Sequence, residues 1–138
     1  GADVNARDYH SATPLHCVVT NKDMVIMQLL LDKGADVHAC DYHNSTPLHF
    51  AVINKDMVMV QMLLDKGADV NAFLRTRDTA LHISIQNKHM EMFQLLLDNG
   101  ADMNALGRCG ETQLHMAVKN NQMEMVQILL NKGADVNA

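Results

Sequence analysis

The sequence predicts a mainly α-helical solenoid of helix–turn–helix units joined by short β-hairpin or loop fingers. The tripeptide Gly-Ala-Asp begins at Gly1, Gly34, Gly67, Gly100 and Gly133, so the chain repeats every 33 residues without an insertion. Within a repeat, apolar residues recur at helical spacing. One unit of this length cannot bury its apolar face alone, so stacking of neighbouring units is expected to supply the core.

The first repeat shows where the first helix is expected to begin. In Thr13-Pro14-Leu15-His16, Thr is a good N-cap and Pro suits the first helical position, where its missing N–H would be unpaired anyway. Leu15, Val18 and Val19 then fall on one side. These residues predict a short amphipathic helix.

The second helix follows after a break. Asn21-Lys22-Asp23 interrupts and recaps the chain, and helical apolar spacing predicts a helix from about Met24 to Asp32. Gly34 stands where a left-handed residue commonly ends a helix. The Asp and Asn residues of 35–45 are typical of turns and predict an extended hairpin.

Composition excludes several classes of protein. The 138 residues are 48% hydrophobic and 20% charged, which is typical of a folded domain. A net charge of −5 disfavours a nucleic-acid partner. No apolar run approaches eighteen residues, so no membrane insertion is expected. Three cysteines without a CxxC motif and no visible signal peptide favour a reducing, intracellular location: the cytoplasm, with the nucleus as alternative.

The motifs of the repeat resemble those of the ankyrin repeat family. TPLH occurs at residues 13–16 and 46–49, and GADVNA at residues 1–6, 67–72 and 133–138. The resemblance covers the whole chain as a single domain, 1–138, with hairpin-first units 1–33, 34–66, 67–99 and 100–132 and a partial unit 133–138. It implies stacked helix pairs, binding of other proteins, no enzymatic activity and no cofactor.

The third and fourth repeats depart from the pattern. The Asp that opens the hairpin turn is replaced by Leu74 and Gly107, and the glycine usual three positions later survives only as Gly110. In the third repeat Arg77 takes that place, and Arg adopts a left-handed conformation less readily than Gly or Asn. We therefore expect the third hairpin tip to be the least regular.

Recurring histidines and methionines favour structural roles. His16, His49, His82 and His115 lie one repeat apart, on a pitch of about 8–10 Å that is too wide for neighbouring rings to share a zinc ion. We expect them to bond across adjacent hairpins and helix starts. Met59, Met92 and Met125 follow the apolar stripe of the second helix and are expected to pack in or near the core.

One cluster invites a chemical hypothesis. His38, Cys40 and His43 have the spacing H-x-C-x-x-H, which matches no closed zinc pattern and lacks an evident fourth ligand. Cys40 with His43 also lacks an orienting group for nucleophilic catalysis. Neither a metal site nor a catalytic site is therefore predicted.

The hairpin fingers carry the residues expected to bind a partner. Arginines lie only in these fingers, together with most of the aromatic side chains, and interface hot spots favour such residues. The resemblance places binding on the concave surface formed by the fingers and the inner face of the first helices. The candidate residues are Arg7, Tyr9, His10, Cys40, Tyr42, His43, Phe73, Arg75, Thr76, Asp78, Leu106, Arg108, Cys109 and Glu111.

The function expected from the sequence is non-catalytic binding of another protein, with Tyr42, Phe73 and Arg75 as central anchors. The alternative is an architectural spacer or substrate-recruiting segment of a longer array, which the uncapped ends favour; the chain would then be part of a larger protein rather than a monomer. Nucleic-acid contact through the finger arginines is disfavoured by charge. The resemblance also raises hydroxylation of the repeat Asn residues, without independent support in the sequence.

Overall fold

The computed structural model describes residues 2–133 and is mainly helical. The chain divides into two compact units, residues 1–69 and 70–138. The helices of the amino-terminal unit are α1 (Pro14–Asn21), α2 (Met24–Asp32), α3 (Pro47–Ile53) and α4 (Met57–Asp65). The carboxy-terminal unit contains α5 (Ala80–Gln86), α6 (Met90–Asp98), the short 3₁₀ helix η1 (Arg108–Gly110), α7 (Gln113–Lys119) and α8 (Met123–Asn131).

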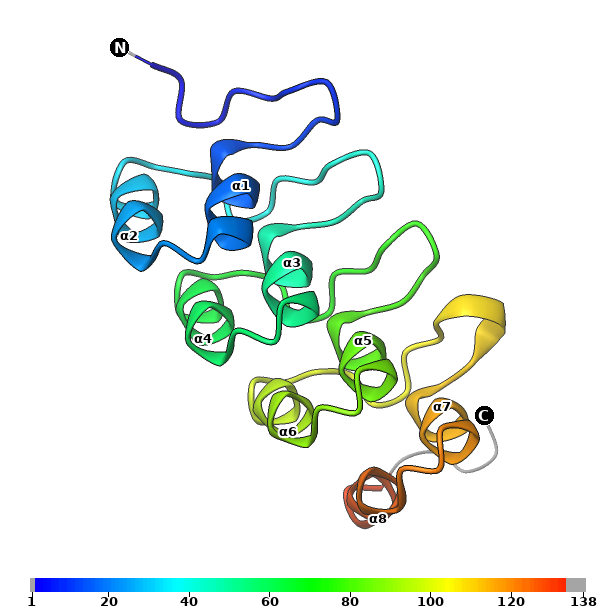
Figure 1. Ribbon diagram of the computed structural model, residues 1–138. Coiled ribbons are helices and arrows are strands. Elements are labelled where there is room, and N and C mark those ends of the chain that lie inside the picture. Colours follow the sequence, from blue (N-terminus) through cyan, green and yellow to red (C-terminus); the bar gives the residue numbers. More distant parts are fainter. Residues whose placement is uncertain (1, 134–138) are drawn as a thin grey trace. The chain divides into compact units, whose positions relative to one another are not determined.

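Each repeat folds as a pair of helices, as the sequence predicts (Figure 1). The two helices of a repeat pack against each other, and the first helices of neighbouring repeats also pack: α1 against α3, and α5 against α7. The pairs follow the 33-residue period over the described residues. Residues 134–138 of the partial repeat lie outside them.

Local sequence sets the helix ends. Each first helix is preceded by an extended Thr N-cap that takes part in a capping box with the histidine three residues later. The carboxylate of Asp23 accepts from the amides of Val25 and Ile26 and caps α2. Gly34 follows α2 with a φ of +90°, which confirms the left-handed residue expected there.

Four loops, here called the fingers, precede the first helices: residues 6–12, 39–45, 72–78 and 105–111. All four share one backbone bond: the amides of Asp8, Asp41, Leu74 and Gly107 each donate to the carbonyl four residues later, at 2.7–3.1 Å. Within each unit the fingers project beside the first helices (Figure 1). Among residues 2–133, one isolated antiparallel β-bridge occurs in these loops, between Phe73 and Thr79 at the third finger.

The expectation that the third finger is the least regular was wrong. Arg77 adopts a φ of +78° at the same turn position where Ser11 has +62°, and the finger is closed by the Phe73–Thr79 bridge. The fourth finger is the exception, because Cys109 and Gly110 are both left-handed and the turn tightens into η1. Its turn also contains a bond from the Glu111 amide to the Arg108 carbonyl at 3.2 Å.

Apolar side chains from both helices of each repeat form the core. Met59, Met92 and Met125 are fully buried, which confirms core packing at that position. The methionines two positions earlier in the repeats are less buried: Met24, Met57 and Met90 are half-buried, and Met123 is exposed. No helix among residues 2–133 combines the length and the apolar character needed to cross a membrane.

Candidate protein-binding surface

In each unit, a buried histidine joins the start of one first helix to the finger of the next repeat. His16 Nδ1 accepts from the Thr13 amide at 3.1 Å, and its Nε2 lies 2.8 Å from the Ser45 carbonyl in the second finger. Because Nδ1 accepts, the proton of the neutral ring lies on Nε2, which donates to the carbonyl. The predicted structural role of His16 is therefore confirmed: it joins the start of α1 to the next finger.

The amino-terminal fingers are also tied directly to each other. The Tyr42 amide donates to the His10 carbonyl at 3.1 Å. Arg7 Nη1 donates to the carbonyls of Cys40 and Ser11 at 2.6 and 3.1 Å. Arg7 was expected to meet a partner, but these bonds show that its guanidinium also holds the first two fingers in place.

The side chains at these finger tips point into solvent. Tyr9 is 95% exposed and Tyr42 is 56% exposed, and His10 and His43 are exposed beside them. Cys40 is half-buried, and burial raises the pKa of its thiol. The rings of Tyr9 and Tyr42 therefore remain available as amphipathic contact area.

A shallow hollow lies beside these fingers, between α1 and α3. It is lined by Cys17, Thr20 and Phe50, and it continues to Ile53. None of these four residues is among the candidates expected from the sequence. Cys17 and Phe50 share one repeat position, and Thr20 and Ile53 share another, so their change from one repeat to the next is the signal that could have found them.

In the carboxy-terminal unit, a polar network holds the fourth finger against the third. Asp78 is only 1% exposed, and its Oδ1 accepts from the Arg108 amide at 2.8 Å. The Arg108 guanidinium lies 3.4 Å from the other carboxylate oxygen. Asp78 was expected on the binding surface; its carboxylate instead lies inside the unit and positions Arg108.

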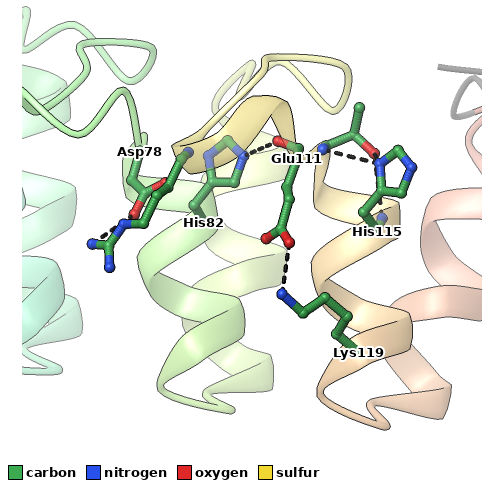
Figure 2. A network of polar contacts seen from close by, with 7 residues as sticks. Asp78, His82, Glu111, His115 and Lys119 are labelled. Carbon is green, nitrogen blue, oxygen red and sulfur yellow. Dashed lines mark hydrogen bonds and ion pairs between the residues drawn. The ribbon is translucent and has the colours of Figure 1, made fainter.

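His82 extends this network to the next repeat (Figure 2). Its Nδ1 accepts from the Thr79 amide at 3.1 Å, and its Nε2 lies 3.2 Å from the Glu111 carbonyl. Burial lowers the pKa of His82, which keeps the ring neutral. His82 therefore repeats the role of His16.

The next histidine in the row is less enclosed. His115 is exposed, and its Nδ1 bonds with the amide and hydroxyl of Thr112 at the start of its own helix. The expected bond to a further hairpin is therefore not seen for this ring among the described residues.

Two residues of this network were not identified from the sequence. Gly107 lies so close to Asp78 and His82 that a Cβ atom there would stand 2.6 Å from Asp78 Oδ1 and 2.7 Å from His82 Nε2. Gln113, which replaces the helix-start proline, is fully buried. With its amide nitrogen turned toward the Met103 carbonyl, it donates at 2.6 Å and its oxygen accepts from His82 Nε2 at 3.2 Å.

Glu111 is paired within the protein. Its carboxylate accepts from Lys119 Nζ at 2.6 Å, as Figure 2 shows, and this bond lowers the pKa of Glu111. Glu111 therefore presents a charge that is already balanced by a neighbouring helix residue.

The tips of the third and fourth fingers are basic and apolar. Phe73 is 48% exposed, and Arg77 Cζ lies 5.2 Å from its ring centroid, within cation–π range. Leu106, at the equivalent position one repeat later, is 54% exposed. The remaining candidates on these fingers are exposed as expected: Arg75, Thr76 and Cys109.

We also searched the described residues for groups that could bind a metal ion. Between residues 2 and 133, no group of three or more histidine, cysteine or carboxylate side chains is placed to hold a metal ion. His38 and His43 are both exposed, and Cys40 Sγ contacts the His38 carbonyl at 3.5 Å. What the fingers do present is aromatic and guanidinium groups on a fixed backbone, which is the chemistry of recognition.

Paired helices at a fixed period, with loops bonded from one repeat to the next, define a helical repeat protein. The ankyrin repeat family model matches residues 1–74 and 72–138, so the chain belongs to the ankyrin repeat family. Ankyrin repeats are generally modules for protein–protein interaction and are typically non-catalytic. A comparison with curated proteins finds no match.

Proposed function

We propose that this chain is a non-catalytic module that binds a partner protein through its finger tips and the adjoining inner faces of the first helices. The observation that carries the proposal is the contrast between backbone and side chains. The finger backbones are fixed by bonds such as those of His16 and Asp78, whereas Tyr42, Phe73 and Arg75 extend into solvent.

This contrast has an energetic consequence. Because the fingers are held before any partner arrives, docking orders few additional backbone segments and loses little conformational entropy. Tyr and Phe lose few rotamers on contact, and Arg supplies several donors. Such residues on a rigid frame favour recognition over a purely spacing role.

The test compares two sets of substitutions in capture from an extract of source cells followed by mass spectrometry. The finger variant carries Tyr42→Ala, Phe73→Ala and Arg75→Ala. The control variant carries Val58→Ala and Glu124→Ala, exposed residues of the second helices. Circular dichroism first checks that both variants fold.

We expect a protein that is retained by the wild type and the control variant and is lost by the finger variant. Retention of the same proteins by all three chains would contradict a finger-based surface. It would favour the alternative, a spacer or recruiting segment, in which the finger side chains have no binding role.

A further inference from the structure

We propose that the third and fourth fingers form a site for a short acidic peptide segment, in which Asp or Glu side chains flank an apolar residue. This inference rests on the proposed function and specifies the chemistry of the partner. It starts from an uneven charge distribution: three of the four arginines in a chain of net charge −5 lie in these two fingers, Arg75, Arg77 and Arg108.

The nearby acids do not neutralise the tip of the third finger. Asp78 is buried and engaged by Arg108, and Glu111 is paired with Lys119. Within the described part of the carboxy-terminal unit, residues 70–133, no ion pair joins a carboxylate to Arg75 or Arg77. The segment 73–77 thus presents two positive charges that no carboxylate of this part of the unit pairs.

Arg77 is already held in place. Its guanidinium lies over the Phe73 ring at 5.2 Å, so part of its rotamer freedom is restricted before binding. The planar guanidinium pairs with a carboxylate through two parallel hydrogen bonds. A carboxylate is therefore the ligand that suits this arrangement.

Apolar surface lies beside these charges. Phe73 and Leu106 occupy equivalent positions in successive repeats of one unit, and both are about half exposed. The bond from the Arg108 amide to Asp78 fixes the two fingers relative to each other. An apolar side chain of the ligand would cover Phe73 and Leu106 while its acidic neighbours meet Arg75 and Arg77.

The extent of the charge favours a peptide over a nucleic acid. Nucleic-acid binding depends on many phosphate contacts by Lys and Arg, whereas here the arginines of this unit lie on two finger tips and its lysines lie away from them, at Lys88, Lys119 and Lys132. The second helices of the same unit carry exposed Glu91 and Glu124. A phosphate backbone would therefore find few contacts beyond the fingers, whereas a peptide of a few residues needs no more.

The amino-terminal fingers provide an internal comparison. Tyr9 and Tyr42 stand at the positions that Arg75 and Arg108 occupy two repeats later. Ser11 and Asn44 stand at the position of Arg77. The acidic ligand is therefore expected to depend on the carboxy-terminal unit. Val58, an exposed residue of α4 outside the fingers, serves as a control.

The experiment measures binding of two labelled pools of eight-residue peptides by fluorescence anisotropy. One pool is built from Glu, Asp, Leu and Phe, and the other replaces the acids with Gln and Asn. The proteins are the wild type, the double variant Arg75→Gln/Arg77→Gln, Phe73→Ala and the control Val58→Ala. A single-stranded oligonucleotide is tested in parallel at low and physiological salt.

We expect the acidic pool to bind the wild type and Val58→Ala with similar affinity, and the amide pool to bind roughly tenfold more weakly or not at all. The double variant and Phe73→Ala should each lose about tenfold in affinity for the acidic pool. Equal binding of the two pools, no binding of either, or tighter binding of the oligonucleotide would overturn the proposal.

These outcomes are separable from the fate of the proposed function. If capture from extract still depends on the finger residues while the peptide pools show no preference for acids, the binding role stands and the acidic ligand is wrong. If capture does not depend on the fingers and the pools do not bind, both proposals fail.

Discussion

Substitution of Gly107 by alanine tests whether the fourth finger is held by close contact with the third. The φ of Gly107 is −99°, which any residue adopts, so the requirement is for space rather than for backbone freedom. An added Cβ would lie 2.6 Å from Asp78 Oδ1 and 2.7 Å from His82 Nε2. Both side chains are buried, and neither can move away without giving up hydrogen bonds.

The expected cost follows from overpacking. Inserting a methyl group into a filled interior usually costs about 1–3 kcal/mol, and we expect Gly107→Ala to lose that amount of unfolding free energy. If the finger moves outward instead, the amide of Arg108 leaves the Asp78 carboxylate, and a hydrogen bond to a charged group contributes about 1.5–3 kcal/mol. The two routes are alternatives, so their costs do not add.

Urea unfolding followed by circular dichroism measures this cost, and a double substitution checks its cause. In an Asp78→Ala background one of the two close contacts is absent, so Gly107→Ala should cost less than it does in the wild type. A loss below about 0.5 kcal/mol in the wild type, or an undiminished loss in the Asp78→Ala background, would refute the reasoning.

Three further predictions concern titration and capping. Burial lowers the pKa of His82 below its ordinary value of 6.5, so the unfolded chain binds more protons at this residue than the folded chain does. The free energy of unfolding should therefore fall as pH drops below about 6.5, by at most about 1.4 kcal/mol per pH unit. In the variant His82→Asn, urea midpoints should depend less on pH. His89 is the N-cap of α6 and makes no side-chain capping bond, whereas Asp56 makes one at the same position of α4. The variant His89→Asp should therefore raise the free energy of unfolding, measured by urea titration, by about 1 kcal/mol. No gain in that free energy would contradict the capping argument. The amides of Ala12 and His10 donate hydrogen bonds to the Asp8 carboxylate and lower its pKa. Loss of this acceptor in Asp8→Ala should speed hydrogen exchange at both amides, whereas Asp8→Asn keeps an acceptor oxygen and should not. Equal exchange in the two variants would contradict the role of Asp8 as the acceptor in this turn.

Helix positions could be predicted from the sequence because they depend on local signals. The second helix of the first repeat was expected from Met24 to Asp32 and lies there, since Asp23 and Gly34 mark its ends chemically. The core methionines were predictable for the same reason: their spacing, repeated with the period, places them on one face of a helix.

The network around Asp78 could not be predicted in this way. At its position the other repeats carry Ala12, Ser45 and Glu111, so the period gives no indication that a carboxylate there is buried. Its burial depends on Gly107, some thirty residues away, which leaves room for it. A residue that departs from the repeat pattern is easily interpreted as a binding residue. Here the two departures serve each other instead, because Gly107 leaves the space that the buried Asp78 side chain occupies.

Regularity of the third finger was misjudged for a related reason. A positive φ at Arg77 is unfavourable in isolation, but the contact of its guanidinium with Phe73 and the Phe73–Thr79 bridge compensate for it. Sequence propensity describes the isolated residue and contains neither contact.

The hydrogen bonds between repeats join residues that are 29–33 positions apart within the units. This narrow range has a consequence for how such a chain changes in length during evolution. A duplicated 33-residue segment arrives with its own donors and acceptors at the separations that its neighbours already use, so it finds its partners without altering any other contact. Gain of a whole repeat therefore preserves the existing hydrogen bonds between repeats. An insertion of a few residues within a repeat would break several of these bonds at once.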